Sequence, residues 1–154
     1  MGDRAPDFEL LDDHGARVRL SSFTGQPVVL YFYPEDDSPG CTAQACGFRD
    51  DISQFEELDA VVIGVSPDAP VSHSAFRDKF RLPFVLLSDP GNSVATLYGS
   101  YGEKQLYGQT VVGTIRSTFL VGPDRRILGV FRNVRTEGHS RRMVEQLAAA
   151  LEKR

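Results

Sequence analysis

The sequence contains no tryptophan and only two cysteines among its 154 residues. No stretch approaches the roughly 20 consecutive apolar residues needed to span a bilayer, and the N-terminus lacks the apolar run of a secretory signal peptide. These absences predict a cytoplasmic protein with no membrane partner, in a compartment where thiols are kept reduced. Two neighbouring cysteines in that compartment are typical of a redox-active or metal-binding site rather than of a structural disulfide.

Neither sign of charge dominates the composition. The 17 basic and 21 acidic residues give a formal net charge of −4, which argues against nucleic acid as a general partner. Internal repeats, low-complexity tracts and linker-like charge runs are also missing. The length is that of one domain, so we expect residues 1–154 to form a single domain.

Short and nearly continuous apolar runs are typical of strands buried on both faces of an α/β sheet. Such runs cover residues 28–33, 60–65, 84–88 and 118–121. A turn-rich segment at 122–126 joins the last of them to a further strand at 127–131, which indicates a hairpin. Near the N-terminus, residues 8–11 and 17–20 flank a second hairpin-like turn.

Helical patterns lie between these strands. Apolar residues at helical spacing run from Cys41 to Phe55, and further helices are expected over residues 71–80 and 138–152. Asp89 followed by Pro90 predicts the N-cap and first turn of a shorter helix that continues through Leu97. This order of elements predicts an α/β fold, in which a mixed sheet begins with alternating βα units and ends with a hairpin and a helix.

The two cysteines, Cys41 and Cys46, lie in a segment that reads as strand, turn and helix. At the start of a helix, N–H groups without intrahelical partners and the helix dipole favour a thiolate over a thiol. On one ideal helix the two Cα atoms would be about 8.6 Å apart, and a disulfide tolerates at most about 7 Å. The pair can therefore bridge only if the first turns unwind. The same geometry places Cys41 on the buried stripe and Cys46 on a more solvated face.

Three interpretations of this pair are open. The cysteines are two ordinary residues, one buried and one exposed, or part of a metal site, or a reactive thiolate that is oxidised and then captured by Cys46. The metal site is disfavoured because the usual second pair of ligands is missing. The histidines are scattered singly, and each is expected to be a surface or capping residue: His14, His73 and His139.

The neighbouring residues favour the reactive thiolate. Pro34 ends the strand, and Pro39-Gly40 makes a tight turn that directs backbone N–H groups toward one point. Ser38 either hydrogen-bonds the sulfur or an incoming oxygen, or is a plain turn and N-cap residue. Arg116 begins a buried strand; arginines at strand edges are usually solvated, but one that faces the first helix would stabilise a thiolate permanently.

The spacing Pro34-x3-Ser38-x2-Cys41, with Cys46 five residues on and Arg116-Ser117-Thr118-Phe119 downstream, resembles the peroxiredoxins. The subfamily that it resembles is called bacterioferritin comigratory protein or peroxiredoxin Q. The resemblance covers nearly the whole chain. It extends to further segments, which are Ala5-Pro6-Asp7-Phe8, Tyr31-Phe32-Tyr33-Pro34, Phe48-Arg49-Asp50, Gly64-Val65-Ser66 and Leu87-Ser88-Asp89.

This resemblance implies a thioredoxin fold, with a central mixed β-sheet flanked by helices and an N-terminal β-hairpin extension. Cys41 matches the peroxidatic cysteine and Cys46 the resolving cysteine, while Pro34, Ser38 and Arg116 match the other catalytic positions. Ser38 stands where most members have threonine. Gln44 stands where close relatives often carry glutamate; its amide can hydrogen-bond to an arginine but cannot form a charged pair.

The activity implied by the resemblance is reduction of hydrogen peroxide and organic hydroperoxides without a metal, haem, flavin or nicotinamide. Thioredoxin or a similar dithiol would then reduce the Cys41–Cys46 disulfide, and the subfamily implies a monomer. The alternative is a redox sensor or thiol-exchange protein on the same fold. A thioredoxin-type oxidoreductase is disfavoured, since its two cysteines are separated by two residues, and a non-enzymatic binding module ranks last.

Overall fold

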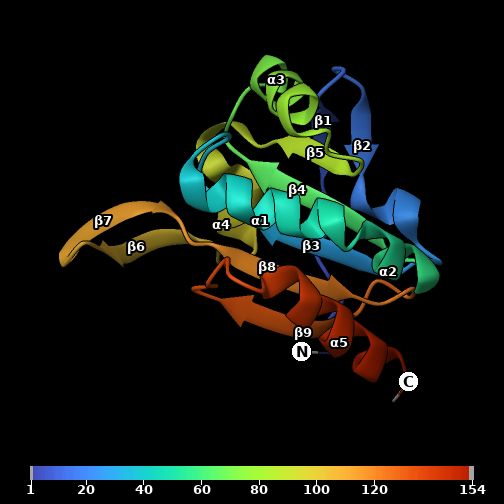
Figure 1. Ribbon diagram of the computed structural model, residues 1–154. Coiled ribbons are helices and arrows are strands. Elements are labelled where there is room, and N and C mark those ends of the chain that lie inside the picture. The colour runs from blue at the N-terminus through green and yellow to red at the C-terminus, as the bar shows by residue number, and fades with distance from the viewer. Residues whose placement is uncertain (1, 153–154) are drawn as a thin grey trace.

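A seven-stranded mixed sheet forms the centre of the structure, a computed structural model that describes residues 2–152 (Figure 1). The strand order is β2-β1-β5-β4-β3-β8-β9. The strands are β1 (Glu9–Asp12), β2 (Arg17–Arg19), β3 (Val28–Phe32), β4 (Val61–Ser66), β5 (Val85–Ser88), β8 (Ser117–Val121) and β9 (Ile127–Arg132). β3, β4 and β5 run parallel, whereas the other neighbours pair antiparallel. The predicted mixed sheet and N-terminal hairpin are confirmed.

Helices cover both faces of this sheet. They are η1 (Leu20–Phe23), α1 (Pro39–Asp50), α2 (Ile52–Glu57), α3 (Pro70–Phe80), η2 (Pro90–Asn92), α4 (Ser93–Leu97) and α5 (His139–Glu152). Side chains of β3 alternate between the two faces, as the pleat of a strand requires. One core joins β3 to α1, α2, α3 and α5 and contains Tyr31 and Phe48, while the other lies against the N-terminal segment and α4 and contains Phe32.

Among residues 2–152, no helix is long and apolar enough to cross a membrane.

The prediction of one helix from Cys41 to Phe55 is wrong in one respect. The helix is interrupted at Asp51, which separates α1 from α2. The Asp51 backbone leaves the helical region with φ −99° and ψ 10°. Its carboxylate accepts a hydrogen bond of 2.6 Å from the Ser140 hydroxyl on α5. This bond ties the point where α1 ends to the last helix, α5. The apolar stripe nevertheless continues across the break, since Phe48 and Phe55 are both fully buried.

The short helix expected from Asp89 begins there as the 3-10 helix η2, with Asp89 as its N-cap and Pro90 in its first turn, but the α-helical part, α4, begins only at Ser93. Gly91 and Asn92 adopt positive φ angles of 71° and 58°, which interrupt a helical path. The Asp89 carboxylate still caps α4, because it accepts hydrogen bonds from the backbone N–H groups of Val94 and Ala95 at 3.0 and 2.9 Å.

A hairpin between α4 and β8 was not predicted from the sequence. Its strands, β6 (Tyr101–Leu106) and β7 (Gln109–Thr114), pair only with each other and project away from the main sheet (Figure 1). Tyr107 and Gly108 form the tip with φ angles of 53° and 79°, as a two-residue hairpin turn requires. The hairpin ends at Thr114, and the chain returns to the main sheet immediately after Arg116. The hairpin is therefore next along the chain to a predicted site residue.

Each histidine was expected to be a surface or capping residue, but two of the three are buried. His73 on α3 is fully buried, and His139 at the start of α5 is 2% exposed. Burial and the nearby guanidinium of Arg142 lower the pKa of His139 to about 4, so its neutral ring hydrogen-bonds to the Thr118 hydroxyl at 2.8 Å. Only His14 lies on the surface as predicted.

Candidate active site

Cys41 lies in the first turn of α1, on the buried face of the helix. Ser38 is the N-cap, Pro39 is the first helical residue, and the first helical hydrogen bond runs from the Thr42 N–H to the Ser38 carbonyl at 2.8 Å. The backbone N–H groups of Gly40 and Cys41 precede this bond, at the positive end of the helix dipole. Cys41 itself is 1% exposed. Both the helical position and the burial agree with the sequence prediction.

Arg116 comes directly before β8 and reaches across to α1. Its Nη2 donates a hydrogen bond to the Cys41 Sγ at 3.3 Å, so a permanent positive charge lies against the sulfur. Gly40 allows this approach, because a Cβ atom there would lie 3.3 Å from the same Nη2. Arg116 is therefore not a solvated strand-edge residue but faces the first helix.

Gln44, one turn after Cys41, shares this guanidinium. Arg116 Nη1 donates to the Gln44 Oε1 at 2.7 Å, and because a guanidinium only donates, this contact fixes which end of the amide carries the oxygen. Gln44 is 1% exposed, and its Nε2 has no hydrogen-bond partner among residues 2–152. The amide thus orients Arg116 without adding a negative charge beside the sulfur.

Tyr31 on β3 forms part of the apolar core around Cys41. Its ring stacks on Phe48 of α1 with centroids 4.7 Å apart. Burial, and then the charge of Cys41, raise the pKa of Tyr31 well above its usual range. Its hydroxyl therefore stays protonated, and this group also lacks a partner within the described part of the chain.

A second cation, Lys104 on β6, was missed by the sequence analysis. Its Nζ donates to the Thr114 carbonyl at 2.6 Å. Burial and the charge of Arg116 lower the pKa of Lys104, while the charge of Cys41 opposes that shift. No local pattern could have identified this lysine, since its position depends on the unpredicted β6–β7 hairpin.

Pro34 and Ser38 bound the segment between β3 and α1. Pro34 is half-buried directly after the strand, as expected. The Ser38 hydroxyl donates to the Glu35 carbonyl at 3.1 Å, which is the turn-stabilising role rather than a contact with the Cys41 sulfur. Any contact of Ser38 with an incoming oxygen therefore requires its hydroxyl to rotate.

Cys46 is half-buried in the same helix and is not bonded to Cys41. Because α1 runs without a break through both residues, the helical separation derived from the sequence applies, and the two sulfurs cannot bridge in this conformation. Cys46 also lies on the more solvated face, as predicted.

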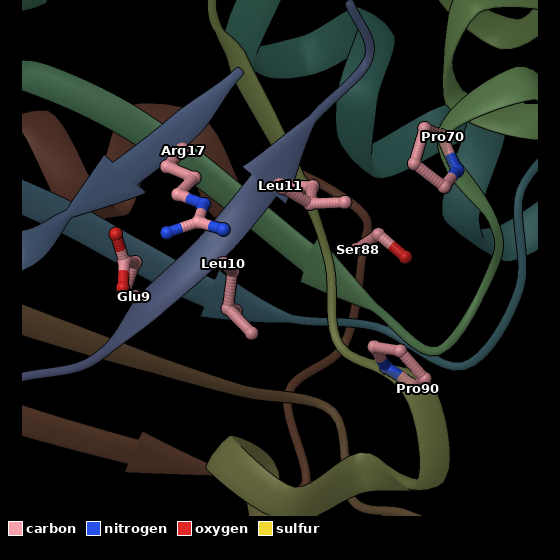
Figure 2. Close-up of a pocket in the computed structure, with 7 residues that line it drawn as sticks. All are labelled: Glu9, Leu10, Leu11, Arg17, Pro70, Ser88 and Pro90. Carbon is pink, nitrogen blue, oxygen red and sulfur yellow. The ribbon is translucent and has the colours of Figure 1, made fainter. Parts of the chain in front are cut away.

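The cavity in Figure 2 is separate from this cluster. It has a volume of about 300 Å³ and lies between the β1–β2 hairpin, the start of α3 and the segment after β5. Its lining residues are Glu9, Leu10, Leu11, Arg17, Pro70, Ser88 and Pro90, none of which was predicted as a site residue.

Among residues 2–152, no group of three or more histidine, cysteine or acidic side chains could hold a metal ion.

Gly64 on β4 has no side chain, and this leaves room for the ring of Tyr31 on the neighbouring strand β3. A Cβ atom at position 64 would lie 2.8 Å from the Tyr31 Cζ and 2.9 Å from its hydroxyl oxygen. We expect Gly64→Ala to destabilise the fold by about 1–3 kcal/mol, because a buried ring must shift. Urea unfolding checks this, with Gly113→Ala as the control, since a Cβ there meets its nearest atom at an ordinary 3.6 Å. Equal midpoints for the two variants would contradict the packing argument.

Comparison with known proteins relates this geometry to a family. A family model described as the AhpC/TSA family matches residues 1–130. The chain is 47% identical to a putative peroxiredoxin of Mycobacterium tuberculosis, over 96% of this chain and 94% of that protein. It is 43% identical to peroxiredoxin Bcp of Bacillus subtilis, over 99% and 98% of the two chains.

Solved structures agree with the sequence comparison. Peroxiredoxin Q of Xylella fastidiosa superposes with a TM-score of 0.90 at 35% identity, covering 97% of this chain and 95% of that one. The bacterioferritin comigratory protein of Xanthomonas campestris, described for its alkyl peroxide reduction activity, gives a TM-score of 0.87 at 32% identity, covering 92% and 90%. The likeness therefore extends over the helices and strands that place Cys41 and Arg116.

Proposed function

The chain belongs to the AhpC/TSA family, among the peroxiredoxins of the bacterioferritin comigratory protein or peroxiredoxin Q group, and is thus a thiol peroxidase; on that premise we propose that Cys41 attacks the hydroperoxide and Cys46 resolves the product. The observation that carries this assignment is the 3.3 Å contact from Arg116 Nη2 to the Cys41 Sγ at the start of α1. A helix N-terminus and a guanidinium together favour the nucleophilic thiolate.

In the first step the Cys41 thiolate attacks the terminal oxygen of the hydroperoxide in line with the O–O bond. An S–O bond forms, the O–O bond breaks, and the departing oxygen takes a proton to leave as water or an alcohol. Arg116 and the free N–H groups of the first turn stabilise the negative charge that develops on the oxygens. Because a more acidic thiol gives a weaker nucleophile, positioning of the peroxide by these donors supplies much of the rate.

In the second step the Cys46 thiol attacks the Cys41 sulfenic acid. The S–S bond forms as the S–O bond breaks, and the hydroxyl leaves as water with the proton of the Cys46 thiol. The first turns of α1 unwind to bring the sulfurs together. An external dithiol, thioredoxin or a similar donor, then reduces the disulfide by exchange and is itself oxidised.

Coupled turnover tests this assignment. Reduced protein, a thioredoxin system and NADPH are mixed with hydrogen peroxide or an alkyl hydroperoxide, and NADPH oxidation is followed. We expect sustained turnover that stops when thioredoxin is omitted. A single oxidation event without steady-state flux, even with other dithiol donors, would instead indicate a redox sensor.

Cys46→Ser separates the two steps. We expect the first reaction with peroxide to stay within about twofold of the parent, because the Arg116 guanidinium donates to Cys41 and Gln44 and not through Cys46. The intramolecular disulfide should be absent, and the sulfenic acid should go on to sulfinic acid as the peroxide dose increases. Intact-mass spectrometry with a thiol-blocking reagent measures both products. If the parent instead gains oxygen and goes on to sulfinic acid like the variant, without first losing two hydrogens, Cys46 does not resolve the sulfenic acid and the pair is assigned wrongly.

A further inference from the structure

A buried hydrogen-bonded pair, His73 and Asp36, joins α3 to the segment that leads into the Cys41 helix. His73 Nδ1 lies 2.7 Å from the Asp36 Oδ2, with the two side chains 0% and 4% exposed. Asp36 lies between Pro34 and Ser38, and therefore in the turn that delivers Cys41 to the start of α1. The proposed peroxide chemistry makes no use of this pair.

Hydrogen bonds hold both members of the pair. His73 Nε2 lies 2.8 Å from the Leu87 carbonyl, which only accepts, so that nitrogen carries a proton. Nδ1 lies 2.7 Å from the Asp36 Oδ2, and one proton is shared between them. The Asp36 carboxyl group also accepts hydrogen bonds from the Tyr33 and Ser72 hydroxyls at 2.6 and 2.7 Å. Both side chains are therefore fixed by further partners on other segments.

The backbone of the same turn is anchored too. The Asp36 N–H donates to the Asp68 Oδ2 at 2.8 Å, and that oxygen also accepts from the Ser66 hydroxyl at 2.7 Å. Asp37, the next residue, has a positive φ of 61°, a conformation that requires local support in a residue other than glycine. The turn is thus fixed from both the side chain and the backbone of Asp36, two residues before the N-cap of α1.

We propose that the Asp36–His73 pair sets the balance between the helical form of α1 that reacts with peroxide and the unwound form in which Cys46 reaches Cys41. This inference rests on the proposed two-step function. Peroxide reacts with Cys41 where Arg116 contacts the sulfur, and that contact exists only while the first turn of α1 is in place. Removing one partner of a buried hydrogen-bonded pair leaves the other polar group without its partner, so it selectively destabilises the state that holds the turn in place. Asp36 and His73 are positioning residues and do not touch the substrate.

The proposal predicts opposite effects on the two chemical steps. In Asp36→Asn the reaction of Cys41 with peroxide should slow by about tenfold, and disulfide formation should become severalfold faster, as expected for a shift between two conformations. If the pair only stabilised the fold, Asp36→Asn would lower the fraction of folded protein but would not slow one chemical step while speeding the other. Ser72→Ala removes one hydrogen bond to the same carboxylate and should change both rates in the same directions by about twofold to threefold.

Asp13→Asn is a matched control, because the partner of Asp13 also lies on α3. Asp13 is buried to a similar extent and pairs with Arg77 of α3 at 2.7 Å, yet it lies in the β1–β2 turn far along the chain from Cys41. The Asp13→Asn variant loses a buried contact of similar length but leaves every residue of the turn before α1 unchanged. We expect a lowered thermal midpoint in this variant with both chemical steps unchanged.

Quenched-flow intact-mass spectrometry resolves the two steps, because the sulfenic acid, disulfide and reduced masses differ. Amide hydrogen exchange of the reduced proteins gives a readout independent of activity. Exchange over residues 39–46 should increase in Asp36→Asn and Ser72→Ala but not in Asp13→Asn. Failure of the parent itself to react would contradict the proposed function. If the parent reacts but Asp36→Asn and Ser72→Ala match it in both steps, or slow both steps together, the positioning role of the pair is overturned.

Discussion

Cys41→Ser is expected to reduce peroxide turnover to the uncatalysed background. A serine hydroxyl is not ionised near neutral pH, and no other group in the first turn of α1 can accept an oxygen atom from the substrate. The fold should survive, because the smaller hydroxyl occupies the same buried position and can accept the hydrogen bond from Arg116 Nη2. NADPH-coupled turnover with a thioredoxin system measures the loss.

Cys46→Ser serves as the control. It retains the attacking sulfur of Cys41, so each molecule of this variant should still be oxidised by one molecule of peroxide. Circular dichroism and thermal unfolding of both variants show whether the loss has a structural cause. Turnover that persists in Cys41→Ser would mean that Cys46 is the attacking thiol, and the roles of the two cysteines would be reversed.

Removal of Arg116 is expected to have the second-largest effect. Arg116→Gln takes away the charge beside Cys41 and the guanidinium held by Gln44. Loss of one preorganised donor to a developing oxyanion typically costs about 10²–10³ in rate, and we expect a loss of that size in the reaction of reduced protein with hydrogen peroxide. Alkylation of Cys41 by iodoacetamide at neutral pH should slow as well, because the positive charge beside the sulfur is gone.

Arg116→Lys distinguishes charge from geometry. The lysine keeps a positive charge but cannot donate from two fixed nitrogens to the Cys41 sulfur and the Gln44 oxygen at once. We therefore expect near-parent alkylation of Cys41 but a peroxide rate that stays at least about tenfold low, because the peroxide is no longer positioned. Full recovery of both rates in this variant would show that charge alone is sufficient, contrary to the proposed role of the guanidinium.

Local sequence patterns predicted much of the fold and the central pair of cysteines. Continuous apolar runs located the inner strands, and helical spacing correctly placed Cys41 in the core and Cys46 nearer to solvent. These features depend on residues close together in the chain, whose geometry is fixed by the helix or strand itself. The helix break at Asp51 was missed because the apolar stripe continues across it, and the bond from Ser140 to Asp51 joins residues 89 positions apart.

Contacts between distant segments could not be read from the sequence. His73 was expected to be a surface or capping residue, but it is buried, with hydrogen-bond partners supplied by Asp36 and Leu87 from two other segments. Lys104 approaches the site only because the β6–β7 hairpin folds back before Arg116. Tertiary packing decides these positions, so periodicity within one helix or strand carries no signal for them.

The most direct test of the account is the rate at which reduced protein loses the Cys41 thiol on rapid mixing with hydrogen peroxide. The chain has no tryptophan, so the reaction is best followed by acid quenching and intact-mass spectrometry, with free cysteine measured in parallel. We predict oxidation at Cys41 several orders of magnitude faster than that of free cysteine, followed by a disulfide to Cys46. A rate no higher than that of free cysteine would contradict the central claim that the first turn of α1 and Arg116 form a peroxide-reducing site.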